Sequence, residues 1–366
     1  MNVGWVEERN PTPPWFTLPP THPINNRASL LKIIVMNKLL NCKFCNIFLP
    51  IGLPIILAIL GCNHRNLNNN YTQDHQNQKI SQNLPQVVVT TTILCDITNQ
   101  IAKESINLIC LVPPGLEPPI YQPTPEDIKA IKKADLILYH GYNFEPNLIK
   151  SFKNSRKNIA KISVGQRAVK QPQKLRQNGK IINEPHIWHD VRNAIKMVEV
   201  VNFQLGKISP ENQQRYNSNT RQLTRELKEL NQWIKSTLST IPDKKRKLLT
   251  THGAMIYYVK AYGLDYKGTL PDISNEDKLT AKSLAEYIKT TQAPIIFADR
   301  AVNLMLLAPI AKKTKVKIFP RPLYIDGLGE PGSDGETYQK MMDANTRSIV
   351  EGLGGTYLRF APNIGR

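Results

Sequence analysis

The chain has 366 residues, of which 41% are hydrophobic and 21% are charged. This composition supports a packed core and excludes wholesale disorder, collagen-like chains, coiled coils and multi-span membrane proteins. The length allows two domains or one large one, at about 100–200 residues per domain. The 48 Lys and Arg residues exceed the 29 Asp and Glu residues and give a formal net charge of +19. These basic residues are scattered and their densest run, Lys244–Lys247, has no interleaved aromatic residues, so we expect no nucleic-acid partner.

An apolar run near the N-terminus predicts export from the cytoplasm. Residues 36–61 begin with a lysine-containing segment, which is followed by a mostly apolar stretch at 47–60. This pattern is typical of a signal peptide, and the stretch is too short and too often interrupted by Pro and Gly for a membrane span of about 20 residues. It ends in Gly61-Cys62, which resembles the lipobox of bacterial lipoproteins. The resemblance implies lipidation of Cys62; the alternative is an ordinary signal peptide with an incidental cysteine.

The segments on either side of this signal have no pattern of a folded domain. Residues 1–35 contain six prolines and no hydrophobic periodicity, so we expect a non-native or disordered extension, with translation starting at Met36. Residues 62–84 are rich in asparagine and predict a polar tether. The expected mature protein is held by a lipid anchor, in the periplasm or on the outer face of the cytoplasmic membrane.

The first half of the remaining chain alternates short β-branched runs with helical stretches. Helices are predicted at 93–103 and from Thr124, where Thr124-Pro125-Glu126-Asp127 combines an N-cap residue, a first-turn proline and two acids. Strands alternating with helices indicate βαβ units and a largely parallel sheet. The predicted strands are residues 86–91, 106–112, 135–139 and 159–164.

A long helix separates this half from a second α/β half. Residues 209–240 contain no glycine and carry apolar residues at helical spacing, which predicts a helix ~48 Å long. Alternation then resumes, with strands expected at 247–251, 294–298 and 316–319, a helix ending at Tyr262 and a last helix at 333–352. The predicted fold is therefore α/β, with parallel-sheet lobes at 85–208 and 242–366 joined by a linking helix at 209–241.

Three residues at the ends of predicted elements are candidate metal ligands. The sequence has no G-x-S-x-G, Walker or H-E-x-x-H motif. His186 lies in a loop entering a helix, His252 follows a predicted strand, and Asp326 follows the segment Leu323–Ile325, which we also expect to be a strand. Ligands bind beyond the carboxyl ends of strands in α/β sheets. Each residue alone is more often a cap or a surface group, but two imidazoles and a carboxylate together suit Zn²⁺.

Several blocks of sequence, in the same order, resemble the zinc/manganese-type solute-binding lipoproteins of bacterial metal ABC importers. The resemblance covers about Val87 to Tyr357 and implies two α/β lobes joined by one rigid helix, with a metal site in the cleft between the lobes. It also implies a monomer that is not an enzyme and that delivers its metal to an importer permease. The matching blocks are TTT at 90–92, YQPTPED at 121–127, GYNFE at 141–145, PHIW at 185–188, YYVKAYGL at 257–264 and GETY at 335–338.

The resemblance implies four metal ligands, of which this sequence offers three. The second, third and fourth correspond to His186, His252 and Asp326. The first is expected to be a histidine in a segment resembling G-x-D/E-P-H-x-Y, but residues 115–121 read GLEPPIY and place Pro119 there. Proline has no donor atom in its side chain, so the chain is a divergent member.

Three substitutes for the missing ligand are open. A bound water is the simplest, and Glu117 and His189 are the protein alternatives. The sequence departs again at Asp299, where relatives carry glutamate.

We expect a receptor that captures Zn²⁺, with Mn²⁺ as the second choice because nitrogen ligands favour zinc. A metal-free or adhesin-like relative that has lost the site is the alternative, and a zinc hydrolase is less favoured because no general base is evident. Cys95 and Cys110 either form a disulfide or remain buried free thiols; their spacing does not decide.

Overall fold

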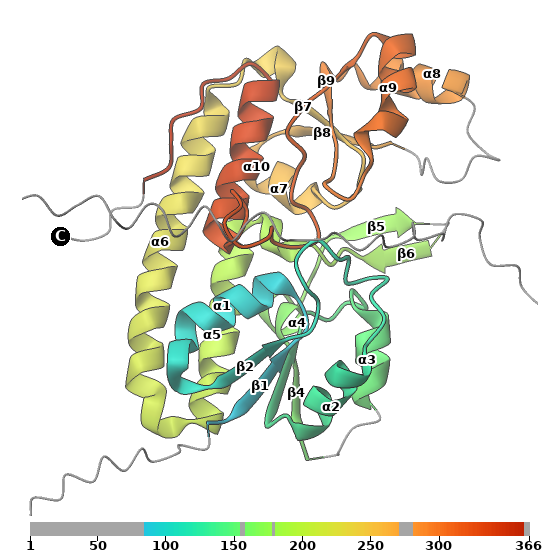
Figure 1. Cartoon of the computed structure of the whole chain (residues 1–366). Helices are drawn as coiled ribbons and strands as arrows, with labels where there is room; N and C mark the ends of the chain where they lie inside the picture. Colours follow the sequence, from blue (N-terminus) through green and yellow to red (C-terminus); the bar gives the residue numbers. More distant parts are fainter. Residues whose placement is uncertain (1–83, 154–157, 178–179, 271–280, 362–366) are drawn as a thin grey trace, which may run out of the picture. The chain divides into compact units, whose positions relative to one another are not determined.

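The computed structural model describes residues 84–153, 158–177, 180–270 and 281–361, all of which belong to one compact unit of the chain (Figure 1). The expected extension at 1–35, the signal peptide at 36–61, the lipidation site Cys62 and the tether up to residue 83 lie outside the described residues. Within the described ranges, no helix is both long enough and apolar enough to cross a membrane.

The first sheet has four parallel strands in the order β2-β1-β3-β4. Val88 in the central strand β1 is fully buried and pairs with Ile109 on one side and Ile137 on the other. All four strands were predicted from the sequence, and they are β1 (Gln86–Val89), β2 (Asn107–Cys110), β3 (Leu136–Tyr139) and β4 (Ala160–Ser163).

Helices accompany these strands, as expected for βαβ units. The predicted cap of α2 is confirmed: Thr124 Oγ1 accepts the N–H of Asp127 at 3.1 Å, and the Asp127 carboxylate accepts the N–H of Thr124 at 2.8 Å. The two bonds form a capping box that fixes the start of the helix. The helices of this half are α1 (Thr92–Ala102), α2 (Pro125–Lys133), α3 (Pro146–Lys153), α4 (Val164–Ala168) and α5 (Val191–Ile208).

The second sheet is also parallel, with the strand order β10-β9-β7-β8. The sequence predicted β7, β9 and β10 but not β8, whose residues DYKGT include no apolar run. The elements are β7 (Lys247–Thr250), α7 (Ile256–Tyr262), β8 (Asp265–Thr269), α8 (Ala281–Thr291), β9 (Ile295–Phe297), α9 (Leu304–Thr314) and β10 (Lys317–Ile318). An antiparallel hairpin of β5 (Lys174–Gln177) and β6 (Lys180–Asn183), also unpredicted, precedes α5.

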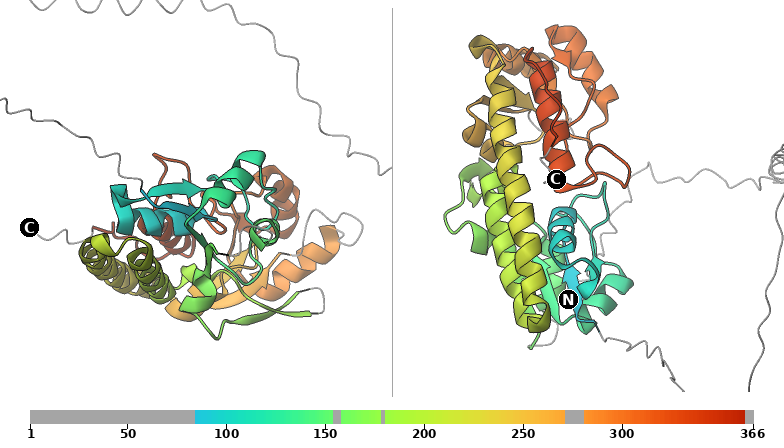
Figure 2. Two further views of the ribbon diagram at one scale, coloured as in Figure 1. Left: turned by 90° about the horizontal axis from the view of Figure 1, so that it is seen from below. Right: turned by 90° about the vertical axis from the view of Figure 1, so that its left-hand side faces the viewer.

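The long helix α6 spans Gln213–Ser239 and runs past both sheets (Figures 1 and 2). It is ~40 Å long and shorter than predicted, because Pro210–Asn212 form a 3-10 turn. Its apolar stripe, which includes Leu223, Leu227 and Leu230, is buried. The helix contacts α1 and α5 of the first half and α7 and α10 of the second. The division of the chain at residues 209 and 242 stays a prediction.

The last helix, α10 (Tyr338–Gly352), begins five residues later than predicted. The φ angle of Gly332 is 83°, which a right-handed helix does not allow. Thr337 then caps the helix by accepting the N–H of Lys340 at 3.3 Å. Asp334 and Gly335, which the sequence placed in the helix, form a turn ahead of this cap.

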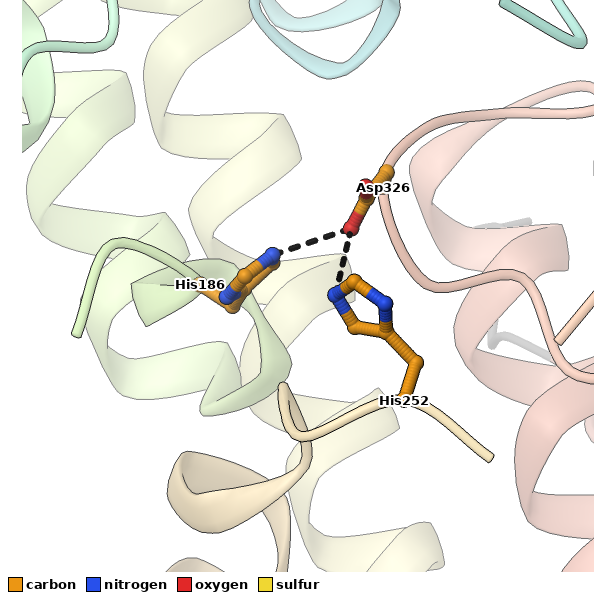
Figure 3. A group of neighbouring side chains, drawn as sticks. All are labelled: His186, His252 and Asp326. Carbon is orange, nitrogen blue, oxygen red and sulfur yellow. Dashed lines mark hydrogen bonds and ion pairs between the residues drawn. The ribbon is translucent and has the colours of Figure 1, made fainter. Parts of the chain in front are cut away.

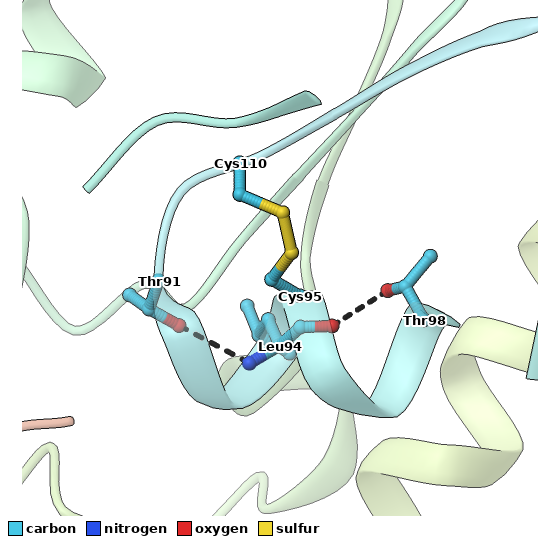
Figure 4. Close-up of a disulfide and its surroundings, with 5 residues drawn as sticks. All are labelled: Thr91, Leu94, Cys95, Thr98 and Cys110. Carbon is cyan, nitrogen blue, oxygen red and sulfur yellow. Dashed lines mark hydrogen bonds between the residues drawn. A yellow bond between two sulfur atoms is a disulfide. The ribbon is translucent and has the colours of Figure 1, made fainter. Parts of the chain in front are cut away.

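Cys95 on α1 and Cys110 at the end of β2 form a disulfide, with their Cα atoms 5.8 Å apart (Figure 4). The bond crosses from the helix to the edge strand of the first sheet. This settles the alternative that the sequence left open. Disulfides are typical of proteins in oxidising compartments, so the bond agrees with the predicted export.

Candidate metal centre

The side chains of His186, His252 and Asp326 meet at one point (Figure 3). Oδ1 of Asp326 lies 2.9 Å from Nε2 of His186 and 3.6 Å from Nε2 of His252. One potential ligand atom from each residue lies within 4.8 Å of the other two. Ligands that share one zinc ion at about 2.0–2.2 Å each have a similar separation, so the three groups could hold one metal ion.

Each of these residues is placed by the end of a backbone element. His186 follows the β5–β6 hairpin and caps the 3-10 turn Ile187–His189, which leads into α5. His252 comes two residues after the carboxyl end of β7. Both placements follow the sequence-based expectation.

Asp326 lies in a different backbone setting from the one predicted. Residues 319–325 form no continuous strand, and Leu323 makes only an isolated parallel bridge with Asp299. Instead, Asn345 on α10 holds the adjacent Tyr324, donating to its carbonyl at 2.7 Å and accepting its N–H at 2.8 Å. A buried side chain therefore replaces the missing strand partner on this segment.

Glu184 fixes the orientation of the His186 ring. Its buried carboxylate accepts the backbone N–H of His186 at 3.0 Å and a hydrogen bond from Nδ1 of the ring. A carboxylate on one ring nitrogen directs the other nitrogen toward a metal and raises its basicity. Nε2 of His186 accordingly faces Asp326. The sequence analysis missed this residue, because the turn at Pro185 that brings the two side chains together leaves no periodic signal.

The hydrogen bonds of His186 also control its charge. Burial alone favours the neutral ring, but the hydrogen bonds to Asp326 and Glu184 outweigh burial and raise the pKa of His186 to about 9. Burial acts in the opposite direction on Asp326, yet the hydrogen bond and charge of His186 hold its pKa below the usual value. Without an ion, therefore, the proton of His186 bridges the two groups at neutral pH.

His189, a possible substitute ligand from the sequence, lies outside this ligand group. It is fully buried, and its Nε2 donates to the carbonyl of Ile325 at 3.1 Å. Burial, together with the charge of His186, lowers the pKa of His189 to about 3, so its ring is neutral. His189 thus neither faces solvent nor points a free Nε2 at the ion site; it supports the segment that carries Asp326.

A pocket of about 370 Å³, partly open to solvent, is lined by Asp326, whereas His186 and His252 are not among its lining residues. Glu117 and Asp299 line it together with Asp326. Burial and the Asp326 charge raise the pKa of Glu117, and the same two causes raise the pKa of Asp299 to about 6. The full lining consists of Gly115, Leu116, Glu117, Asp299, Arg300, Ala301, Tyr324, Ile325, Asp326, Gly327 and Leu328.

Comparison with known proteins identifies the family. Residues 87–352 match the family model described as "Zinc-uptake complex component A periplasmic". The manganese ABC transporter substrate-binding lipoprotein scaA of Streptococcus gordonii is 32% identical over an alignment of 278 positions that covers 73% of this chain and 88% of that protein. A metal ABC transporter substrate-binding lipoprotein of Lactococcus lactis is 30% identical over 85% of this chain and 98% of its own length.

The fold comparison agrees with the sequence comparison. The periplasmic zinc binding protein TroA from Treponema pallidum matches with a TM-score of 0.67 and 26% identity, over 74% of this chain and 99% of that one. This likeness confirms the predicted α/β fold with two parallel sheets. With the family model matched over most of the chain, the protein belongs to the family of periplasmic zinc-uptake component A proteins, which confirms the family that the sequence predicted.

Proposed function

We propose that His186, His252 and Asp326 bind the divalent transition-metal ion that this chain captures for an ABC importer. Members of the family are solute-binding proteins of metal ABC transporters and not enzymes, which removes the zinc hydrolase alternative. The observation that carries the assignment of residues is the convergence of the three side chains from distant parts of the sequence.

Zinc is the ion that we propose for the site, and we expect manganese to bind more weakly. Two of the three donors are imidazole nitrogens, which suit zinc better than manganese. Zinc also binds more tightly than manganese to most sites with nitrogen and oxygen donors. The relatives are named for manganese and for zinc alike, so their names do not discriminate between the two ions.

We further propose that the protein is anchored by a lipid on Cys62, in the periplasm or on the outer face of the cytoplasmic membrane, and delivers the ion to a permease as a monomer. The names of the relatives as substrate-binding lipoproteins support the anchor and the transporter partner.

Capture of the ion requires an exchange of a proton for a metal. Nε2 of His186 is blocked by its proton as long as the ring donates to Asp326. An arriving ion displaces this proton. The other proton stays on Nδ1 of His186, and its hydrogen bond to Glu184 holds the ring in place. The side chain of His252 is 40% exposed, whereas those of His186 and Asp326 are 9% and 8% exposed. His252 is therefore the ligand that an ion from solvent meets first.

Titration of the purified metal-free chain with Zn²⁺ and Mn²⁺ in a calorimeter tests this proposal. We expect one ion per chain and a loss of binding in H186A and D326A. Asp343→Asn is a matched control, since this α10 aspartate binds Tyr357 and does not line the pocket. No binding at micromolar zinc would instead support a metal-free relative that has lost the site.

A further inference from the structure

Asp299 lies between the two chain segments that carry His252 and Asp326. Its backbone N–H donates to Oγ1 of Thr251, the neighbour of His252, at 2.8 Å. On its other side, Asp299 bridges Leu323, three residues before Asp326. The N–H of Leu323 donates to the carbonyl of Ala298 at 2.8 Å. These hydrogen bonds hold the backbone of Asp299 next to both segments.

Asp299 lines the pocket that Asp326 also lines. Asp299 is only 6% exposed, and it accepts one backbone hydrogen bond, from Ala301 at 3.2 Å. Among the described residues, no Lys, Arg or His nitrogen forms an ion pair with it. The guanidinium of Arg300, which also lines the pocket, instead lies over the Tyr324 ring at 4.6 Å. His252 lowers the pKa of this carboxylate through its charge but forms no ion pair with it. A buried carboxylate without an ion pair is costly, and a cation in the pocket would reduce that cost.

The proposed metal site is also incomplete without a further donor. Pro119 stands where the sequence resemblance expects a histidine, and proline offers no side-chain donor. His186, His252 and Asp326 thus supply three donors, whereas zinc sites usually have four ligands. A carboxylate in the adjoining pocket wall matches both needs, since the ion lacks a ligand and Asp299 has no ion-pair partner.

We propose that Asp299 is the fourth protein ligand, an oxygen donor in place of the imidazole that Pro119 removes. The inference rests on the proposed function of the other three residues. Asp299 is not within the 4.8 Å group, so its carboxylate must turn toward the ion when the ion binds. The completed donor set has two nitrogens and two carboxylates. Zinc still binds more tightly than manganese, but the added oxygen contributes more to manganese binding. The difference in affinity between the two ions is therefore smaller.

Asp299→Asn tests this assignment because it removes the charge and keeps the size. Dissociation constants are measured for Zn²⁺ by competition with a chelator and for Mn²⁺ by the electron paramagnetic resonance of free Mn²⁺. We expect the Mn²⁺ dissociation constant to increase at least about tenfold, the smallest effect usual for the loss of a residue that supports a metal site. The Zn²⁺ dissociation constant should increase less. Asp343→Asn, which removes the same charge outside the pocket, should leave both constants unchanged.

Two further variants keep the test decisive. Asp299→Glu retains the carboxylate and should retain Mn²⁺ binding, even if Asp299→Asn fails to fold. The Co²⁺ absorption spectrum should change in Asp299→Asn and not in Asp343→Asn, because it reports the ligands of the ion. The unfolding temperature of each ion-free variant shows whether it is folded.

The outcomes separate this inference from the proposed function. If the wild-type chain binds metal and Asp299→Asn binds it with the same dissociation constants, the role of Asp299 is overturned and the three-residue site stands. A loss of metal binding in Glu117→Gln without a loss in Asp299→Asn would also overturn it, and would assign the oxygen donor to Glu117 instead. Absence of binding in the wild-type chain would overturn the proposed function itself.

Discussion

The hydroxyl of Thr92, the first residue of α1, accepts a hydrogen bond from the N–H of Leu328 at 2.9 Å. Leu328 is two residues beyond Asp326, so a helix of the first half holds the loop that carries a proposed ligand from the second half. Asp96, one turn further along α1, accepts the N–H of Tyr338 at 2.8 Å. Together, these bonds tie the start of α1 to both ends of the segment between Leu328 and α10.

Thr92→Val should weaken metal binding without touching a proposed ligand. The substitution keeps the shape of the side chain but leaves the N–H of Leu328 without its partner, at a cost of about 1–3 kcal/mol. Because Asp326 is then held less firmly, we expect the zinc dissociation constant, measured by calorimetry, to increase several-fold. Thr98→Val on the same helix is the control, since Thr98 donates only to Leu94 within α1. Equal affinities in the two variants would show that the Thr92 bond does not position the loop.

Glu184→Gln should reduce zinc affinity about 10–100-fold, the usual effect of losing a carboxylate that supports a metal-bound histidine. Glutamine keeps an oxygen near Nδ1 of His186 but lacks the charge that raises the basicity of the ring. Zinc competition titrations measure the effect, and the unfolding temperature of the ion-free variant checks the fold. Wild-type affinity in a folded Glu184→Gln protein would mean that the His186 ring is held by its packing alone.

Metal binding should release about one proton at pH 7, because His186 must lose the proton that it shares with Asp326. The raised pKa of His186, about 9, means that the ring is charged in the ion-free protein below that pH. Zinc affinity should therefore increase as the pH rises toward 9 and then level off. Calorimetry in two buffers with different ionisation enthalpies gives the proton count. A count near zero at pH 7 would contradict the shared proton.

The three converging residues could be predicted because each lies at the end of a segment that the pattern of apolar residues reveals. His252 ends an apolar run, His186 precedes an amphipathic helix, and Asp326 follows a short apolar segment. Only His252 follows a strand of a parallel sheet; His186 follows the antiparallel β5–β6 hairpin and Asp326 follows no continuous strand, so the convergence itself was not predictable from strand ends. The main strands were predictable for the same reason, since each is a short buried run between turn residues.

The supporting residues could not be predicted in this way. Glu184 reaches His186 through the backbone turn at Pro185, and Asp299 reaches the site through bonds to Thr251 and Leu323, which are 48 and 24 positions away in the sequence. Neither arrangement has a period or a local motif. Strand β8 escaped prediction because tertiary pairing with β7, and not its own polar composition, makes it a strand.

Replacement of both Cys95 and Cys110 with serine should destabilise the protein by about 3 kcal/mol, the value expected for opening a loop of about 15 residues. The bond holds α1 against the edge strand β2, and the bonds of Thr92 and Asp96 do not depend on it directly. Zinc affinity should therefore change much less than the free energy of unfolding, which denaturant titration measures. A loss of affinity as large as that in Thr92→Val would indicate that the disulfide itself positions α1 for the metal site.

Pro119→His should restore the donor that the sequence lacks. Pro119 is half-buried in the loop that also carries Glu117, a residue of the pocket wall, so a side chain at 119 starts close to the ion site. An added imidazole favours zinc over manganese. We expect zinc to bind at least about tenfold more tightly, a gain of about 1.4 kcal/mol, and manganese to gain less. Pro119→Ala separates the new donor from the effect of losing the proline ring. If histidine and alanine give the same zinc affinity, the loop holds residue 119 away from the ion.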